Sequence, residues 1–211
     1  MTEALAIVLG YLLGSIPSAY LATRWATGGD IRRLGGGNVG GLNVFREIGV
    51  GPALAAGITD VGKGAAAVAI AQWGLKAPEA YVQLAGLAAV VGHNWMVWLK
   101  FSGGKGMGAT FGVLAVLLPL YGYSLLLGIF IAVIIVPLTI TRNVALSLGI
   151  GLLALPFIIW FGTGSGYAII VSIALGLIIT ARFSPTALGA IRKSGMAAFG
   201  VDRWQRNKKD S

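Results

Sequence analysis

The sequence predicts an all-α protein that crosses a membrane about seven times, with its N-terminus outside and its C-terminus in the cytoplasm. Hydrophobic residues make up 56% of the 211 residues, and the mean hydropathy is +0.83. Only 11% of the residues are charged, which is about half the fraction usual in soluble domains. Apolar blocks of almost twenty residues recur along the chain, and an α-helix needs about that length to cross a bilayer.

The same composition excludes several classes of site. The chain has no cysteine, so disulfides, thiol nucleophiles and zinc–thiolate sites are excluded. One histidine and seven acidic residues argue against a metal site, and we expect none. The net charge of +9 is compatible with nucleic-acid binding, but Lys and Arg also gather in cytoplasmic loops of membrane proteins. We favour that explanation and expect no nucleic-acid partner.

Seven apolar blocks are candidate spans. Their residue ranges are 4–23, 50–73, 79–99, 106–120, 122–140, 144–161 and 166–182. The first block has no basic segment before it and is interrupted by Pro17 and Arg24, which indicates a retained helix and not a cleaved signal peptide. The apolar stretch 106–140 is too long for one helix and short for two full ones. Within it, Pro119 and Gly122 on either side of Tyr121 predict a tight turn between two short helices.

The distribution of basic residues decides the number of spans and their orientation. With seven spans, fourteen of the sixteen Lys and Arg residues fall on one side: Arg24, Arg32, Arg33, Arg46, Lys100, Lys105, Arg142, Arg182, Arg192, Lys193, Arg203, Arg206, Lys208 and Lys209. Lys76 lies on the other side and Lys63 within a span. With six spans this bias would collapse, so the positive-inside rule predicts seven spans and a cytoplasmic C-terminus. We expect a seven-helix domain over 1–183 and a basic cytoplasmic tail over 184–211, which can lie on anionic lipid.

The first predicted cytoplasmic loop, TGGDIRRLGGGNVGGLNVFREIG over residues 27–49, contains eight glycines. Consecutive glycines can direct several N–H groups toward one anion, so Gly35, Gly36 and Gly37, followed by Asn38, are candidates for such a nest. Arg46 would add a forked, permanent positive charge for a phosphate. The alternative is a flexible connector whose arginines only follow the charge bias.

A second glycine-rich loop, KFSGGKGMGAT over residues 100–110, surrounds Lys105 with glycines. It is not a Walker sequence, because the spacing to Lys105 is wrong and no Ser or Thr follows that residue. Two loops of this kind on the same side are more informative than either alone. We expect them to meet, with Arg46 and Lys105 facing one pocket for a phosphorylated molecule at the membrane surface.

A few polar residues lie inside or near the spans. Asp60 and Lys63 are three residues apart and share a helix face. Charges within a membrane are costly and often functional, but a structural ion pair is the simpler interpretation. His93 and Asn94 end the third span, where a lone histidine more often hydrogen-bonds between helices than catalyses. A small polar patch begins the sixth span and consists of Thr141, Arg142, Asn143 and Ser147.

Four sequence segments together indicate a protein family: GSIPSAYL (14–21), GGDIRRLGGGNVGGLNVFREIG (28–49), DVGKG (60–64) and VVGHNWMVWLKFSGGKGMGAT (90–110). Their order and spacing resemble those of the acyl-phosphate-dependent glycerol-3-phosphate acyltransferases of bacterial membranes. The resemblance covers about residues 10–150 and is weak after about 180. It implies a multi-pass enzyme of the bacterial inner membrane that makes lysophosphatidic acid at the cytoplasmic face. Such an enzyme moves a fatty acyl group from acyl phosphate to the 1-hydroxyl of glycerol 3-phosphate, with no metal or other cofactor and no acyl-CoA.

The resemblance also implies roles for single residues. Asn38, Asn43, Arg46, His93 and Lys105 match the family's motifs residue by residue. We expect Asn38, His93 and Lys105 to be catalytic. The expected phosphate- or substrate-binding residues are Gly35, Gly36, Gly37, Asn43, Arg46, Gly103, Gly104, Gly106, Ser147 and Arg182.

The chain departs from the family pattern at several of these positions. Gly36 stands where the family has a functionally important serine, and Ala145 stands where a serine is expected, although Ser147 remains close by. Arg182 and Pro185 replace a histidine and an asparagine at the end of the last span. Loss of one preorganised donor typically costs about a hundredfold in rate, which weakens an enzyme without abolishing it.

Two other functions remain open from the sequence. One is an acyltransferase with a changed acceptor, or a family member without catalysis. The other is a transporter of a phosphorylated solute, which should place polar residues at the midplane of several spans, whereas only Asp60 and Lys63 lie there. The expected partners are acyl phosphate, glycerol 3-phosphate and membrane lipids. The sequence predicts neither the acyl-chain length nor the oligomeric state.

Overall fold

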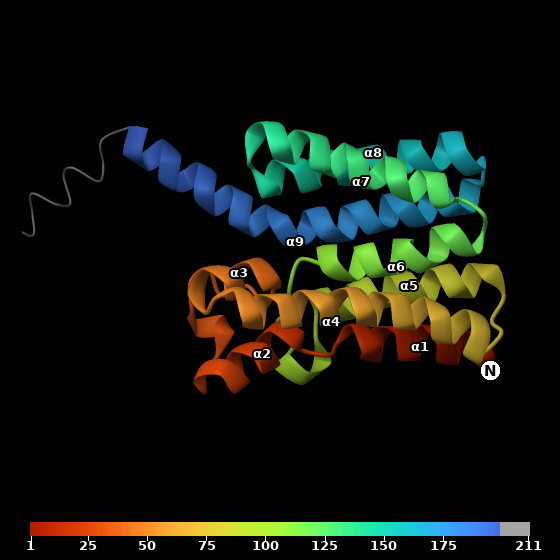
Figure 1. The fold of residues 1–211 in the computed structure, drawn as a ribbon, viewed down its shortest axis with the longest axis horizontal. Helices are drawn as coiled ribbons and strands as arrows, with labels where there is room; N and C mark the ends of the chain where they lie inside the picture. The colour runs from red at the N-terminus through yellow and green to blue at the C-terminus, as the bar shows by residue number, and fades with distance from the viewer. Residues whose placement is uncertain (199–211) are drawn as a thin grey trace, which may run out of the picture. The chain divides into compact units, whose positions relative to one another are not determined.

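The computed structural model of the chain describes the backbone of residues 1–198 and the side chains of residues 1–144 and 146–183. All regular structure in this part is helical, which confirms the predicted fold class (Figure 1). The α-helices are α1 (Thr2–Gly14), α2 (Ser18–Thr27), α3 (Gly41–Glu47), α4 (Val50–Ala69), α5 (Glu79–Asn94), α6 (Met107–Leu120), α7 (Ser124–Thr141), α8 (Val144–Thr163) and α9 (Gly166–Ala198). Short 3-10 helices lie at Ile31–Arg33 and Val97–Leu99, and a π-helical turn, Ile70–Gly74, continues α4.

The chain divides into two compact units, Met1–Ile179 and Thr180–Ser211. The first unit contains α1 to α8 and the beginning of α9. The second begins within α9, which continues as a helix to Ala198. The sequence predicts a separate tail from residue 184, whereas the helix extends well past that point. The side chains of that tail lie outside the described residues.

Six helical segments of the described chain are long and apolar enough to cross a membrane. They are Thr2–Thr27, Val50–Gly74, Glu79–Leu99, Ser124–Thr141, Leu146–Thr163 and Gly166–Phe183. The predicted span over 106–120 is the shorter apolar helix α6. All seven predicted spans therefore correspond to apolar helices, and their number in a membrane stays a prediction, as does their orientation.

The first predicted span is broken in the structure. α1 ends at Gly14 and α2 begins at Ser18, with Pro17 between them. Proline cannot donate a backbone hydrogen bond and disfavours helical geometry in the residue before it, so the helix stops here. The break leaves the carbonyl of Ile16 available to a side chain from another helix, and Lys63 donates to it.

Glycines allow the closest helix contacts. A Cβ on Gly10 or Gly14 would collide with the backbone of Ala85 or Ala89, so α1 and α5 can approach only because these positions lack side chains. Gly64 and Gly112 serve the same purpose between α4 and α6. Small residues are the usual means of helix packing in membranes, because the bilayer provides no hydrophobic force between helices.

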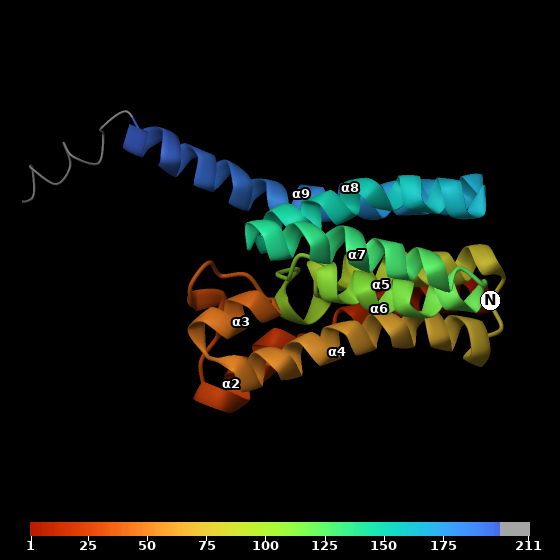
Figure 2. The same ribbon diagram turned by 45° about the horizontal axis from the view of Figure 1, so that its top comes forward.

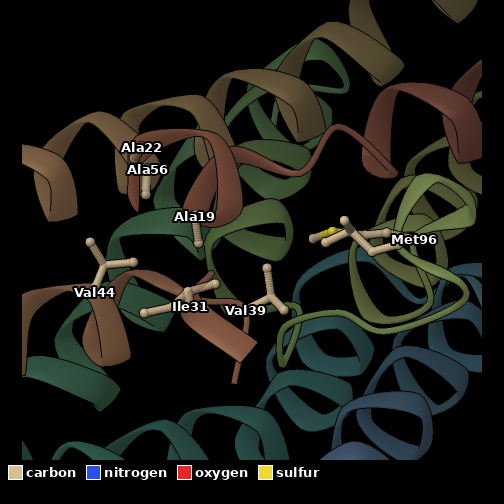
Figure 3. Packing of buried hydrophobic residues seen from close by; sticks show 8 residues of the cluster. Ala19, Ala22, Ile31, Val39, Val44, Ala56 and Met96 are labelled. Atoms are coloured by element: carbon tan, nitrogen blue, oxygen red, sulfur yellow. The ribbon is translucent and has the colours of Figure 1, made fainter. Parts of the chain in front are cut away.

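The glycine-rich loops gather at one end of the first unit. Figures 1 and 2 show α2 and α3 at that end and the N-terminus at the opposite end. A buried apolar cluster packs the loop end together (Figure 3); its members are Ala19, Ala22, Ile31, Val39, Val44, Ala56, Met96 and Leu99. These residues come from α2, the first loop, α3, α4 and the segment that leads into the second glycine-rich loop. The cluster fixes both loops to the helices beneath them.

Candidate functional site

The first glycine-rich loop, residues 27–49, is closed by the side chain of Asn43. Its amide nitrogen donates to the carbonyls of Leu34 and Asn38, each at 3.1 Å, and its Oδ1 accepts the N–H of Gly36 at 3.3 Å. Asn43 is buried in the first turns of α3. The structure therefore gives this predicted substrate-binding residue a role in holding the loop together.

The three consecutive glycines differ in what they require of the backbone. Gly35 and Gly37 have φ angles of +53° and +69°, which glycine adopts far more readily than other residues. Gly36 is exposed, does not share this geometry, and has open space where a Cβ would lie. Its N–H already binds Asn43, and the N–H of Gly37 donates to Leu34 O at 3.0 Å. A phosphate nest at this loop would have to compete with these two internal hydrogen bonds.

The arginines of the first loop have different surroundings. Arg32 binds the carboxylate of Asp30 through two nitrogens, with its closest contact at 2.6 Å, and lies over the ring of Tyr20. These hydrogen bonds hold the pKa of Asp30 below its usual range and raise the pKa of Arg32. Arg46 lies exposed in the last turn of α3. Arg46 is therefore better placed than Arg32 to meet a ligand from solution.

The second glycine-rich loop lies directly on the end of α5, and its last residues, 107–110, already belong to α6. The N–H of Gly104 donates to the carbonyl of His93 at 3.0 Å. A Cβ on Gly103 would overlap the backbone of His93 and Asn94, and one on Gly104 would overlap the His93 ring. Gly106, with φ +79°, begins α6. Glycine is needed at 103, 104 and 106 because a Cβ at each of these positions would overlap the residues at the end of α5.

The two loops meet, as the sequence predicts. Val39 of the first loop shares the buried apolar cluster with Met96 and Leu99. The carbonyl oxygen of Val39 lies 2.7 Å from the position that a Cβ of Gly104 would take. The more specific expectation, that Arg46 and Lys105 face one pocket, stays a prediction.

A cluster of buried polar side chains lies beneath the second loop. Three groups converge on Oδ1 of Asp60: the hydroxyl of Ser18, the ammonium of Lys63 at 2.8 Å and Nδ1 of His93 at 3.2 Å. Lys63 also donates to the carbonyl of Ile16 at 2.9 Å. Asp60, Lys63 and His93 are each less than 5% exposed. The predicted ion pair of Asp60 and Lys63 is confirmed, and His93 forms part of the same cluster.

Asn94 was not among the expected site residues, although it follows His93 in the sequence. It is fully buried, and neither its Oδ1 nor its Nδ2 has a hydrogen-bond partner among the described residues. Oδ1 lies 2.9 Å from the position that a Cβ of Gly106 would take, so the amide faces the start of α6. Buried amides without partners are costly and uncommon. The sequence signal was only its place at the end of a span beside the loop.

Two further expected site residues belong to other elements. Ser147 is buried in α8, and its hydroxyl donates to the carbonyl of Asn143 at 2.9 Å. Arg182 belongs to the second compact unit, within α9. Asn38, the last of the expected catalytic residues, is half-buried, and its carbonyl accepts from Asn43.

A cavity of about 90 Å³ lies at the opposite end of the first unit, away from both loops. It is mostly apolar and is formed by α5, α6, α8 and α9, with Glu79, Tyr121 and Ser165 among its polar residues.

No group of three or more His, Cys, Asp or Glu side chains within the described residues could hold a metal ion. The loop end offers backbone amides, the cationic side chains of the two loops and the buried polar cluster.

Comparison with known proteins yields a consistent result. The sequence model of a family described as glycerol-3-phosphate acyltransferase matches residues 4–191. Glycerol-3-phosphate acyltransferase 1 of Dehalococcoides mccartyi is 47% identical over 208 residues, which is 98% of this chain and 100% of that protein. A glycerol-3-phosphate acyltransferase of Parasynechococcus marenigrum is 42% identical over 86% of this chain and 83% of its own length.

The fold is also similar to that of solved structures. A crystal structure of PlsY (YgiH), an integral membrane glycerol 3-phosphate acyltransferase in its glycerol 3-phosphate form, has a TM-score of 0.77 and 24% identity. The match covers 92% of this chain and 94% of that one. The lysophosphatidic acid form of the same protein has the same TM-score, with 23% identity over 92% of this chain and 93% of that one.

Proposed function

Because the chain belongs to the glycerol-3-phosphate acyltransferase family, we propose that it uses an acyl phosphate as donor and reacts at the cytoplasmic face of a bacterial inner membrane. It is a multi-pass membrane acyltransferase, and it acylates glycerol 3-phosphate in phospholipid synthesis. The observation that best supports the proposed location of the site is the packing of the two glycine-rich loops on one buried cluster. That packing brings Val39 of one loop against Gly104 of the other.

The proposed reaction needs positioning and charge more than it needs a strong base. The 1-hydroxyl oxygen of glycerol 3-phosphate attacks the acyl carbonyl carbon, and the bond between that carbon and the phosphate oxygen breaks. Inorganic phosphate leaves, and a substrate phosphate oxygen takes the hydroxyl proton. Acyl phosphate is a mixed anhydride that is already activated, so holding the two reactants together accounts for much of the rate.

The residues of the two loops have distinct parts in this proposal. Lys105 and Arg46 bind substrate phosphates as cations. Gly104, whose N–H donates to the carbonyl of His93, keeps the loop against α5. The N–H groups of Gly103 and Gly106, just before α6, stabilise the oxyanion or the departing phosphate. Their part is not shared by the N–H groups of Gly36 and Gly37, which serve the first loop itself. Asn38 of the first loop and His93 at the end of α5 are the other catalytic residues of this proposal.

The proposal also concerns the division of the chain into a membrane domain and a tail. We infer that residues 1–183 form the membrane domain and that residues 184–211 form a basic tail on the cytoplasmic side. The excess of Lys and Arg on the loop side supports this orientation. Anionic lipid headgroups would attract such a tail.

A direct assay tests the function. Purified protein in lipid vesicles would be given palmitoyl phosphate and glycerol 3-phosphate, with release of phosphate and formation of lysophosphatidic acid both measured. We expect the two products in equal amounts. Glycerol without its phosphate should not be acylated, and palmitoyl-CoA should not replace the donor. If phosphate is released with a different phosphorylated polyol and not with glycerol 3-phosphate, the acceptor has changed. The departures from the family pattern at Gly36, Arg182 and Pro185 are the reason to test other acceptors.

A further inference from the structure

The buried polar cluster of Ser18, Asp60, Lys63 and His93 borders the loop that binds phosphate in the proposed function. We propose that Asp60 is a positioning residue, which acts through His93 to hold residues 103–106 in the place from which they bind the substrate phosphate. This inference rests on the proposed function for the identity of the substrate. Its structural part, the hold on the loop, does not.

One carboxylate oxygen joins three helices. Ser18 comes from the first turn of α2, Lys63 from α4 and His93 from the last turn of α5, and all three converge on Oδ1 of Asp60. Lys63 adds a link to Ile16 at the Pro17 break. The broken first span is thus attached to α4 and α5 at the level of the second loop.

His93 connects this cluster to the loop. Nδ1 faces Asp60, and Nε2 on the other side of the ring faces Gly104, where no Cβ could be accommodated. Nδ1 lies 3.2 Å from Oδ1 of Asp60, which is an ion-pair distance without the alignment of a hydrogen bond. The carbonyl of the same residue accepts the N–H of Gly104. The orientation of one ring therefore determines how closely the loop can approach α5.

Asp60 also contacts the segment that follows the loop. Its own Cβ lies 2.8 Å from the position that a Cβ of Gly108 would take, in the first turn of α6. A shift of Asp60 would therefore move both ends of the phosphate-binding segment. Buried ion pairs are frequently no more stabilising than apolar residues of similar volume. The presence of the Asp60–Lys63 pair beside the loop therefore agrees better with a role in positioning the loop than with one in stabilising the fold.

The decisive variant is the double substitution Asp60→Asn with Lys63→Met. It removes both charges together, because Asp60→Asn alone would leave a buried ammonium without its partner. We expect a melting temperature close to that of the unmodified protein. The KM for glycerol 3-phosphate should rise about tenfold or more, with kcat changed by less than about threefold, because the loss is one of phosphate binding. Hydrogen exchange of the Gly104 amide should become faster, with exchange elsewhere unchanged.

A second variant and a control keep the result interpretable. His93→Gln leaves the Asp60–Lys63 pair intact and should produce the same rise in KM and the same local exchange. Glu79→Gln changes an exposed acid at the opposite end of the unit and should leave KM and exchange as they are.

The inference is overturned if the double variant, or His93→Gln where the double variant does not fold, has the KM and the Gly104 exchange of the unmodified protein. It is also overturned if exchange rises throughout the chain, since that would indicate a general loss of stability. An unmodified protein that makes no lysophosphatidic acid would refute the proposed function. The exchange measurement needs no substrate and would still decide whether Asp60 holds the loop.

Discussion

Two asparagines near the glycine-rich loops have opposite environments. The amide of Asn43 is engaged on both its nitrogen and its oxygen, which closes the first loop. The amide of Asn94 is fully buried beside the second loop, with no partner among the described residues. Composition and motif predicted a site role for Asn43 and not for Asn94. The structure indicates that Asn43 maintains the loop and that Asn94 retains hydrogen-bonding capacity next to the proposed phosphate site.

Gly36 provides the sharpest test at the residue scale. Replacement by serine restores the hydroxyl that the family has at this position, and the backbone and the space around it accept a side chain. We expect Gly36→Ser to leave the melting temperature unchanged and to raise turnover about tenfold, which corresponds to about 1.4 kcal/mol of transition-state stabilisation. Turnover and melting would be measured on the same preparation.

Gly35→Ser is the matched control for that substitution. Gly35 has a φ of +53°, and a Cβ there would lie 2.5 Å from Glu47 Oε1 and 2.6 Å from Asn43 Oδ1. Left-handed strain alone costs about 1 kcal/mol, so this variant should melt at a lower temperature and lose activity. If Gly36→Ser is stable but turnover does not rise, the hydroxyl has no part in the reaction of this chain.

A second residue-scale prediction concerns Asn94→Leu. Leucine has nearly the same shape as asparagine and removes two buried polar atoms that lack partners, so stability should be unchanged or higher. If the amide serves the substrate or the loop, the KM for glycerol 3-phosphate should rise. Thermal denaturation and steady-state kinetics would separate the two effects. A variant with the KM of the unmodified protein would mean that Asn94 is only a packing residue.

At the scale of elements, the second loop and the start of α6 behave as one unit attached to α5 and α4. Gly103 and Gly104 lie against the end of α5, and Gly108 lies against Asp60 of α4. No side chain can be added at these positions without moving the loop. Glycine is therefore required here for close approach, whereas flexibility would be the only reason for it in an exposed connector.

Gly104→Ala tests that requirement. The added methyl group would overlap the His93 ring and lie 2.7 Å from the carbonyl oxygen of Val39. Overpacking of this kind costs about 1–3 kcal/mol, so the protein should melt at a lower temperature and bind glycerol 3-phosphate less well.

Gly62→Ala makes the same chemical change within α4, where nothing lies within 4 Å of the new methyl group. Alanine favours helices over glycine by about 1 kcal/mol, so this control should be neutral or stabilising. Equal melting temperatures for the two variants would contradict the close packing of the loop on His93.

At the scale of the whole molecule, orientation in the membrane decides which side the site faces. The two glycine-rich loops carry five of the ten basic residues outside the predicted tail. The positive-inside rule then predicts that both loops lie in the cytoplasm.

Labelling with an impermeant thiol reagent would test this orientation, and the absence of native cysteine makes the experiment clean. A cysteine introduced by Thr2→Cys should react in intact cells, and one introduced by Ser211→Cys should react only after the membrane is opened. The opposite pattern would place the loops outside the cell, away from cytoplasmic donors.

The sequence by itself determined the helical class, the seven apolar segments and the two glycine-rich cationic loops. These properties depend on local composition, length and charge, all of which can be read from the amino-acid sequence alone. It also predicted that Asp60 and Lys63 share a helix face, because three residues make nearly one helical turn.

Only the tertiary structure decided which glycines are needed for close approach, which hydrogen bonds Asn43 makes, and that His93 and Ser18 join Asp60. These contacts bring together residues dozens of positions apart, such as Ser18 and Asp60. Gly36 and Gly104 look alike in the sequence, yet one has open space and the other lies against a buried ring. The difference arises from what packs against each backbone, and that depends on the arrangement of all the helices at once.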